Sequence, residues 1–308
     1  MLMEHVSDRD KKKTDRWFKE PGERSLAWLL ITPAYLLIFG LLLFPVLYAL
    51  WVSFHQYTLL NPAIRFVGLD NYKEMLLNSP FWLSFGRTVY FTAVSIGIQL
   101  VLGLAMALVL NQKFVGQRLV RSLLLIPWAI PNIVNGVLWE WIYNANYGAL
   151  NGVLKQFGII KENILWLGKP FLALNMIILA DTWKVIPFYV ILILAGLQTI
   201  SKDTLEAAII DGAGGWKSFL YITLPLLKPI LLVILVLRTM QCFAVFDIIY
   251  IMTKGGPADG TTLVSFFTYR QTFGSLNFGQ GSATAYIVAM MVFAVSLLYL
   301  RMLKSDEA

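Results

Sequence analysis

Six long apolar stretches dominate the sequence and decide what the chain can fold into. They cover residues 27–51, 88–110, 123–143, 171–197, 226–253 and 281–300. About 20 helical residues cross a hydrocarbon layer of roughly 30 Å, so each stretch is long enough for one membrane span. Only 14% of the residues are charged, whereas soluble domains carry about 25%. The sequence therefore predicts an all-α integral membrane protein with about six transmembrane helices.

Lys and Arg residues are concentrated on one predicted side of the membrane. That side includes residues 1–26 and the connections around 113–121 and 200–225. Because cytoplasmic segments retain the excess of positive charge, we expect both chain termini in the cytoplasm. We interpret residues 1–26 and 301–308 as charged tails and residues 27–300 as one membrane domain.

Several functional classes do not fit the sequence. The net charge of +7 does not indicate nucleic-acid binding, because the basic residues lie at predicted membrane boundaries. The phosphate-binding loop of ATPases is missing, since Trp216 separates Gly215 from Lys217 in the nearest similar segment. The only histidines, His5 and His55, are predicted on opposite sides of the membrane. We therefore expect neither enzymatic activity nor a cofactor held by this chain.

The connection over residues 200–225 is too polar to span the membrane and too regular for an open loop. Ser201 is a suitable N-cap for a short helix, and Gly212 is a suitable residue to end it. A second short helix is expected over residues 215–222, with its end at Pro225. The pattern predicts a helix, a sharp turn and a second helix on the cytoplasmic side, and an ordinary surface hairpin is the alternative.

This connection resembles the EAA signature of the permease subunits of binding-protein-dependent ABC importers. The signature is Glu-Ala-Ala, three residues, Gly, nine residues, Ile, one residue and Leu-Pro. The sequence matches it without a gap, at Glu206, Ala207, Ala208, Gly212, Ile222, Leu224 and Pro225. Residues 66–72, 125–127 and 255–257 also resemble family segments. Nearly the whole chain is similar to the maltose/trehalose-type branch that imports sugars.

The resemblance implies a type I-like ABC importer permease fold in which this connection is a cytoplasmic coupling helix. In the family, that helix docks in a cleft of a partner ATPase. The residues expected to make or shape the contact are Glu206, Ala207, Ala208, Asp211 and Gly212. Small alanines permit close approach, and the two carboxylates offer partners to basic groups.

The resemblance also implies an assembly in a bacterial or archaeal cytoplasmic membrane. The expected partners are a second homologous permease, an ATPase dimer that binds ATP and Mg, and an extracytoplasmic solute-binding protein. Within this assembly the chain is expected to pass a sugar, first a di- or oligosaccharide, into the cytoplasm. Another glycoside or glycerol phosphate remains open. An ion-coupled secondary transporter is the alternative from another class, and it leaves the EAA signature unexplained.

Five charged residues fall within the predicted spans, namely Glu140, Asp181, Lys184, Arg238 and Asp247. A charge near the bilayer centre costs at least about 2.5–3.5 kcal/mol, so the deep ones are expected to face protein or water. Glu140 and Asp247 lie near predicted outer ends, where snorkelling explains them. Asp181 and Lys184 are placed to pair along one helical face.

Alignment with the sugar-importing relatives places residues of the fourth and fifth spans at solute-facing positions. These are Asp181, Lys184, Val185 and Phe188, then Arg238, Cys242 and Val245, with Gln241 nearby. A sugar path needs hydrogen-bonding groups and an aromatic surface. Several relatives carry neutral amides or tyrosine where this chain has charges, Cys242 and Val245. Direct solute contact and an internal ion-pair network both remain open, as does a main solute site in the partner permease.

The third predicted span carries two asparagines and two prolines. We expect Asn132 and Asn135 to form hydrogen bonds between helices. Pro127 and Pro131 are expected to bend the helix.

Overall fold

The structure is a computed structural model that describes residues 23–304. The predicted tails at 1–26 and 301–308 lie largely outside the described residues, as does His5. Contacts divide the chain into two compact units, residues 1–52 and 53–308.

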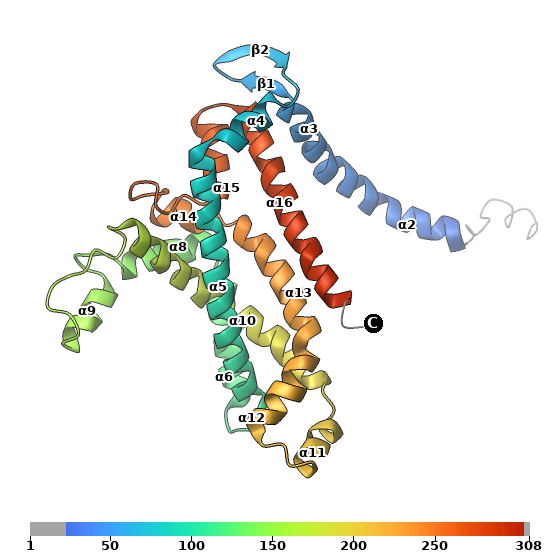
Figure 1. Cartoon of the computed structure of the whole chain (residues 1–308), viewed down its shortest axis with the longest axis vertical. Helices are drawn as coiled ribbons and strands as arrows, with labels where there is room; N and C mark the ends of the chain where they lie inside the picture. The colour runs from blue at the N-terminus through green and yellow to red at the C-terminus, as the bar shows by residue number, and fades with distance from the viewer. Residues whose placement is uncertain (1–22, 305–308) are drawn as a thin grey trace, which may run out of the picture. The chain divides into compact units, whose positions relative to one another are not determined.

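Within its described residues, 23–52, the first unit consists of helix. It contains α2 (Glu23–Leu37), the π-helical segment η1 (Ile38–Leu43) and α3 (Phe44–Ser53), drawn in blue in Figure 1. Leu26–Ser53 is long and apolar enough to cross a membrane, which confirms the first predicted span. Phe44 follows η1 directly and donates its backbone N–H to the Phe39 carbonyl oxygen, and Pro45 comes next, in the first turn of α3, where its missing N–H costs little.

The second unit begins with a hairpin and a short helix that were not predicted from the sequence. These are β1 (His55–Thr58), its antiparallel partner β2 (Asn61–Phe66) and α4 (Asp70–Leu77). The buried amide of Asn71 donates to the carbonyl oxygens of Ser53 (2.8 Å) and His55 (2.9 Å). One side chain of the segment at 66–72 thus ties the start of α4 to β1.

The second and fourth predicted spans are the long helices α5 (Ser79–Asn111) and α10 (Pro170–Thr199). They pack along each other more extensively than any other pair of elements. Gly103 makes this approach possible, because a Cβ atom there would lie 2.8 Å from the Cβ of Tyr189. α5 begins well before the predicted residue 88, since the Asn78 side chain accepts from Phe81 N (3.0 Å) and caps the helix.

The third predicted span is bent rather than straight. It contains α6 (Gln117–Leu124), α7 (Ile126–Ala129) and α8 (Asn132–Ile142), and the helical axis turns by 94° between residues 129 and 132. Pro131 disfavours helical geometry at Ile130, whose ψ is 131°. The expected bend is therefore confirmed at Pro131, and the apolar stretch 123–143 belongs to a bent pair of helices.

The fifth predicted span differs from expectation at both ends. Its elements are α12 (Gly215–Ser218), the π-helical η2 (Phe219–Thr223), α13 (Leu224–Phe243) and α14 (Asp247–Met252). The helix does not end at Pro225, because η2 precedes it and Pro225 falls in the first turn of α13, where no N–H is needed. A break at residues 244–246 separates α13 from α14, but the run Gly215–Met252 is still one candidate span, so the predicted fifth span is confirmed with this interruption.

The remaining elements complete a helical membrane fold. They are α9 (Ala149–Gln156), α11 (Lys202–Ile210), α15 (Val264–Tyr269), η3 (Arg270–Gly274) and α16 (Phe278–Lys304). The described residues hold five helices of spanning length, and six if the bent pair counts as one span. The prediction of a helical membrane fold with about six spans is confirmed.

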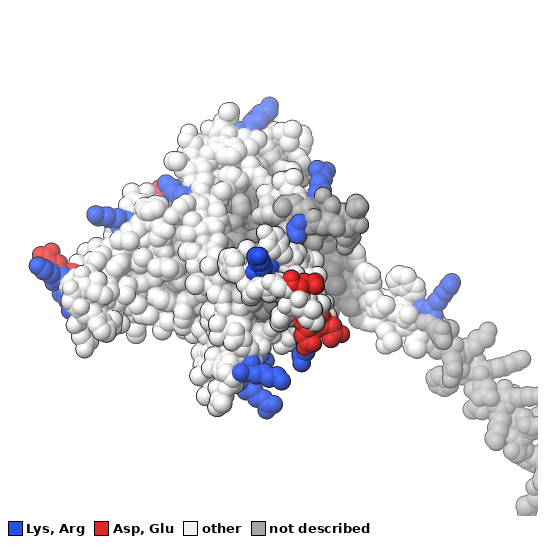
Figure 2. All heavy atoms as spheres, turned by 60° about the horizontal axis from the view of Figure 1, so that its bottom comes forward, with Lys and Arg blue, Asp and Glu red and all other residues white. Residues whose placement is uncertain are grey.

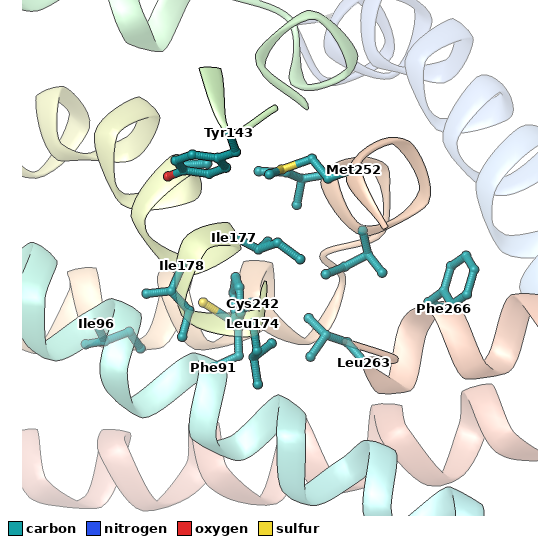
Figure 3. Packing of buried hydrophobic residues seen from close by; sticks show 13 residues of the cluster. Phe91, Ile96, Tyr143, Leu174, Ile177, Ile178, Cys242, Met252, Leu263 and Phe266 are labelled. Atoms are coloured by element: carbon teal, nitrogen blue, oxygen red, sulfur yellow. The ribbon is translucent and has the colours of Figure 1, made fainter. Parts of the chain in front are cut away.

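The main core of the second unit lies where residues of α5, α10, α13, α14 and α15 meet (Figure 3). Its buried side chains include Phe91, Ile177, Cys242, Ile249 and Leu263, none of which is more than 1% exposed. Because these residues belong to five helices, packing in this core sets the orientation of each helix. The polar side chains on the remaining faces of these helices are oriented by the same packing.

Candidate functional site

A cavity of about 400 Å³ lies beside this core, lined by residues of α7, α8, α10, α13 and α14. Both helix breaks border it, because Asn132 and Asp247 each begin a helix directly after a break. Irregular backbone is tolerated at membrane depth where it borders such a polar space. The predicted solute-facing residues that line the cavity are Asp181, Lys184, Val185, Phe188, Arg238, Gln241 and Val245.

Cys242 does not share this position. It is fully buried (0% exposed) in the main core, in the cluster that contains Phe91 and Leu174 (Figure 3). On a helix, Gln241 and Val245 follow Arg238 at spacings that keep them near one face, whereas Cys242 turns toward the core. The placement of Cys242 at a solute-facing position is therefore wrong.

An ion pair between Arg238 and Asp181 forms one wall of the cavity and joins α13 to α10. Both side chains are nearly buried, with 4% and 11% of their surfaces exposed. Gln99 of α5 binds both, because its Nε2 donates to Asp181 Oδ2 (3.2 Å) and its Oε1 accepts from Arg238 Nε (3.0 Å). Arg238 also donates to Gln241 Oε1 at 3.4 Å. Asp181 thus pairs across helices rather than with Lys184.

Lys184 belongs to a second polar chain on the cavity wall. Its Nζ donates to Asn132 Oδ1, and Asn132 Nδ2 donates to Asp247 Oδ2 at 3.0 Å. Asp247 therefore lines the cavity and is bonded there, which replaces the explanation by snorkelling at an interface. Asn135 Nδ2 donates to the Ala180 carbonyl oxygen at 3.4 Å. The predicted hydrogen bonds of both asparagines between helices are confirmed.

An aromatic pair completes the lining. The rings of Trp128 and Phe188 stack with centroids 6.2 Å apart and planes 20° apart, and Trp128 is 50% exposed. The roles of Trp128 and Gln99 were not predicted from the sequence. Gln99 did leave a signal, because it is the only amide in the apolar stretch 88–110. Trp128 left a weaker one, its position between the two prolines of the bend.

The connection that carries the EAA signature folds as a helix and a sharp turn. The Ser201 hydroxyl accepts from Thr204 N (3.2 Å) at the start of α11, as predicted. Gly212 adopts a φ of +78°, and Ala213 N donates to the Ala208 carbonyl oxygen (2.9 Å). This is a Schellman turn, in which glycine takes the left-handed position that other residues adopt at a cost.

This element presents mixed charged and apolar surface. Glu206, Ala207 and Asp211 are exposed, whereas Ala208 is 5% exposed and faces inward. Figure 2 shows Asp and Glu side chains gathered beside Lys and Arg on the face that carries α11 and α12. Large apolar side chains are exposed among them, namely Ile209, Ile210, Trp216 and Tyr221. Exposed apolar surface rimmed by charges is typical of a protein interaction site.

Comparison with known proteins agrees with this arrangement. Residues 99–303 match the family model described as the inner membrane component of binding-protein-dependent transport systems. The chain is 41% identical over 279 residues to the trehalose/maltose transport system permease protein of Thermococcus litoralis, covering 91% of this chain and 94% of that protein. It is 38% identical over 302 residues to the sulfoquinovosyl glycerol transport system permease protein of Agrobacterium fabrum, covering 97% of each. The trehalose permease protein of Mycobacterium tuberculosis is 34% identical, with 91% and 89% covered.

The fold is shared with a solved transporter. A chain in the crystal structure of a bacterial alginate ABC transporter, in complex with a periplasmic protein that carries an alginate pentasaccharide, superposes with a TM-score of 0.76. That match has 22% identity and covers 95% of this chain and 96% of the other. The family prediction made from the EAA signature is confirmed, and the secondary-transporter alternative is not favoured. The chain belongs to the family of inner membrane components of binding-protein-dependent transport systems.

Proposed function

We propose that this chain is the solute-passing permease subunit of an ABC importer for a neutral sugar, first a disaccharide such as trehalose or maltose. Relatives named for trehalose or maltose transport match more than nine-tenths of this chain, at 41% and 34% identity. In this proposal the chain hydrolyses nothing itself, because its sequence contains no phosphate-binding loop.

The observation that carries the proposal is the two-sided cavity. The stacked rings of Trp128 and Phe188 offer an apolar surface to a sugar ring, and the polar side chains opposite offer directed donors and acceptors. Charge favours a neutral solute, because two cations in the lining are matched by two carboxylates. The four are Asp181, Lys184, Arg238 and Asp247. A phosphate ester such as glycerol phosphate finds no uncompensated cation there.

Different cavity residues have different proposed roles. Lys184, Phe188, Gln241 and Val245 contact the solute, because each lines the cavity. Asp181 and Arg238 mainly hold the wall, because their charges satisfy each other. The ion pair and the residues that contact the solute are therefore neighbouring parts of one site, and both earlier alternatives apply to it.

The coupling element is proposed to dock in a cleft of a separate ATPase subunit, which binds ATP and Mg. Its exposed carboxylates at Glu206 and Asp211 suit basic groups on such a partner. The small side chain of exposed Ala207 permits close approach of the partner, buried Ala208 packs on the inner side of α11, and Gly212 makes the turn that returns the chain to the membrane. Closure of the ATPase then moves α11, and the continuous helical run from α12 through α13 transmits this movement to Arg238.

The proposed assembly contains a second homologous permease, two ATPase subunits and an extracytoplasmic solute-binding protein within a lipid bilayer, without nucleic acid. The distribution of Lys and Arg supports cytoplasmic termini and a cytoplasmic α11. The connections on the other side, including residues 255–275, then face the solute-binding protein.

The proposal is tested by uptake of labelled trehalose, maltose and glycerol phosphate into proteoliposomes that contain the complete complex. We expect ATP-dependent uptake of a disaccharide, and a change in the ratio between sugars in Lys184→Ala. Lys155→Ala is the control, because Lys155 is exposed and lies outside the cavity lining. Equal loss for every solute would give Lys184 a structural role only, and uptake without any ATPase would refute the importer.

A further inference from the structure

A second cavity, of about 520 Å³, lies between the first turns of α5, the loop after α14 and the segment formed by α15 and η3. It shares no lining residue with the solute cavity. Its residues include Leu83, Arg87, Asp259, Arg270, Gln271 and Ser275. Its volume suits a small ligand or the headgroup of a lipid.

One wall of this second cavity is built from a tightly held loop. The hydroxyl groups of Thr253 and Thr261 lie 2.7 Å apart, and Thr262 Oγ1 donates to the Gly255 carbonyl oxygen at 3.2 Å. Ala258 and Asp259 nevertheless adopt φ values of +46° and +56°. Left-handed backbone at residues other than glycine persists where its surroundings fix it, and such positions are frequent at binding sites.

The charges of the second cavity are not balanced. Asp259 pairs with Arg270, and Asp259 Oδ1 also accepts from Thr262 Oγ1 at 3.4 Å. The half-buried Arg87 is left over, since its guanidinium group has no hydrogen bond or ion pair within residues 23–304. The side chains of Gln271 and Ser275 also lack partners within this range. The cavity thus offers one free guanidinium group and two neutral polar groups.

We propose that this cavity binds a phosphate oxyanion, supplied by the headgroup of a phospholipid. A guanidinium group presents paired N–H donors that match two phosphate oxygens, and the amide of Gln271 and the hydroxyl of Ser275 add neutral donors. The position favours a lipid as the source, because the cavity lies at the start of the spanning helix α5. Leu83 lines the cavity and is exposed, and Trp82 and Phe273, each next in sequence to a lining residue, are exposed as well; such residues suit the boundary between headgroups and acyl chains.

The test uses the purified complex that contains the full chain, in a phosphate-free buffer with detergent. Phosphatidylglycerol with short acyl chains is titrated, and bound lipid is counted by native mass spectrometry. Arg87→Gln should weaken lipid binding at least about tenfold, because it removes a charge-assisted contact. Arg65→Gln is the matched control, since Arg65 is exposed on β2 and lies outside the cavity lining. Arg87→Lys keeps the charge and should bind with intermediate affinity.

Two further measurements separate the oxyanion chemistry from the source of the oxyanion. Competition by millimolar phosphate, with the same dependence on Arg87, supports the oxyanion chemistry, and lipid retained during purification supports the headgroup as its source. Equal lipid binding by the wild type, Arg87→Gln and Arg65→Gln overturns the proposal. The proposal is also overturned if Arg87→Gln binds lipid as the wild type does but loses affinity for an extracytoplasmic protein. Arg87 would then bind a carboxylate of that protein. Monodisperse elution of Arg87→Gln shows that the variant is folded.

Discussion

Arg238 Nε, near the C-terminal end of α13, donates to Gln99 Oε1 of α5 over 3.0 Å. The same amide donates to Asp181 on α10, so one neutral side chain holds both ends of a nearly buried ion pair. Gln99 itself is fully buried (0% exposed). Three helices therefore meet at a fully bonded polar group next to the solute cavity, where an unbonded charge is expensive.

Gln99→Leu should destabilise the protein, because the variant leaves Arg238 Nε and one bond to Asp181 unmade. The expected loss is about 1–3 kcal/mol of unfolding free energy, the penalty for unpaired buried groups. Thermal unfolding of the purified complex measures it, with Gln198→Leu as a control at an exposed position of α10. Equal midpoints for the two variants would contradict a structural role for Gln99.

The pair Asp181 and Arg238 should show strong energetic coupling. Asp181→Asn or Arg238→Met alone leaves one nearly buried charge without its counterion, which costs about 3–5 kcal/mol. The double variant removes both charges, so it should lose much less than the sum of the two single losses. The exposed pair Asp70 and Lys73 is the control, and its coupling should stay below about 1 kcal/mol.

A double-mutant cycle on unfolding midpoints provides the measurement. Additive effects at Asp181 and Arg238 would mean that water or another group solvates each charge separately. The same variants should affect all transported sugars alike, because this pair holds the wall of the cavity rather than selecting a solute.

Gly103→Ala should weaken the packing of α5 on α10. The added Cβ atom would lie 2.8 Å from Tyr189 Cβ, so the helices must separate, at a cost of about 1–3 kcal/mol. Gly97→Ala is a matched control on the same helix, because nothing lies within 4 Å of its added Cβ atom. Thermal unfolding should distinguish the two variants, and a Gly103→Ala complex as stable as Gly97→Ala would show that the helices do not approach as closely as described.

The lengths and positions of most spans follow from the sequence because they depend on apolar length alone. The break at residues 244–246 does not, since Ala244, Val245 and Phe246 include neither proline nor glycine. Tertiary contacts accompany it instead, as Ser265 Oγ donates to the Val245 carbonyl oxygen and Asp247 accepts from Asn132. A local pattern cannot show contacts between residues that are distant along the chain.

The candidate site shows the same limit. Alignment to relatives indicated cavity positions on α10 and α13, but it could not show which cation forms an ion pair with Asp181. Spacing favoured Lys184, three residues away, whereas packing brings Arg238 into contact and leaves Lys184 to Asn132. Cys242 was misplaced for a related reason, because adjacent helix positions differ by about 100° and only the packed structure shows which of them faces the cavity.

Gly212→Val should uncouple ATP hydrolysis from transport if α11 is the element that meets the ATPase. Gly212 has a φ of +78°, which a β-branched residue adopts at a cost of about 1–2 kcal/mol or more, so the turn after α11 must change. The spans should still insert, because the change lies outside them. In proteoliposomes we expect ATPase activity to persist while uptake falls at least about tenfold. A tenfold change corresponds to about 1.4 kcal/mol of free energy.

Gly214→Val is the matched control for this experiment. Gly214 lies two residues further along the same connection, but its φ is −63° and no atom lies within 4 Å of an added Cβ atom. Uptake should therefore survive in Gly214→Val, because valine adopts this backbone conformation without strain. If both variants transport normally, the turn at Gly212 does not transmit force, and another contact must connect the ATPase to the helical run from α12 through α13.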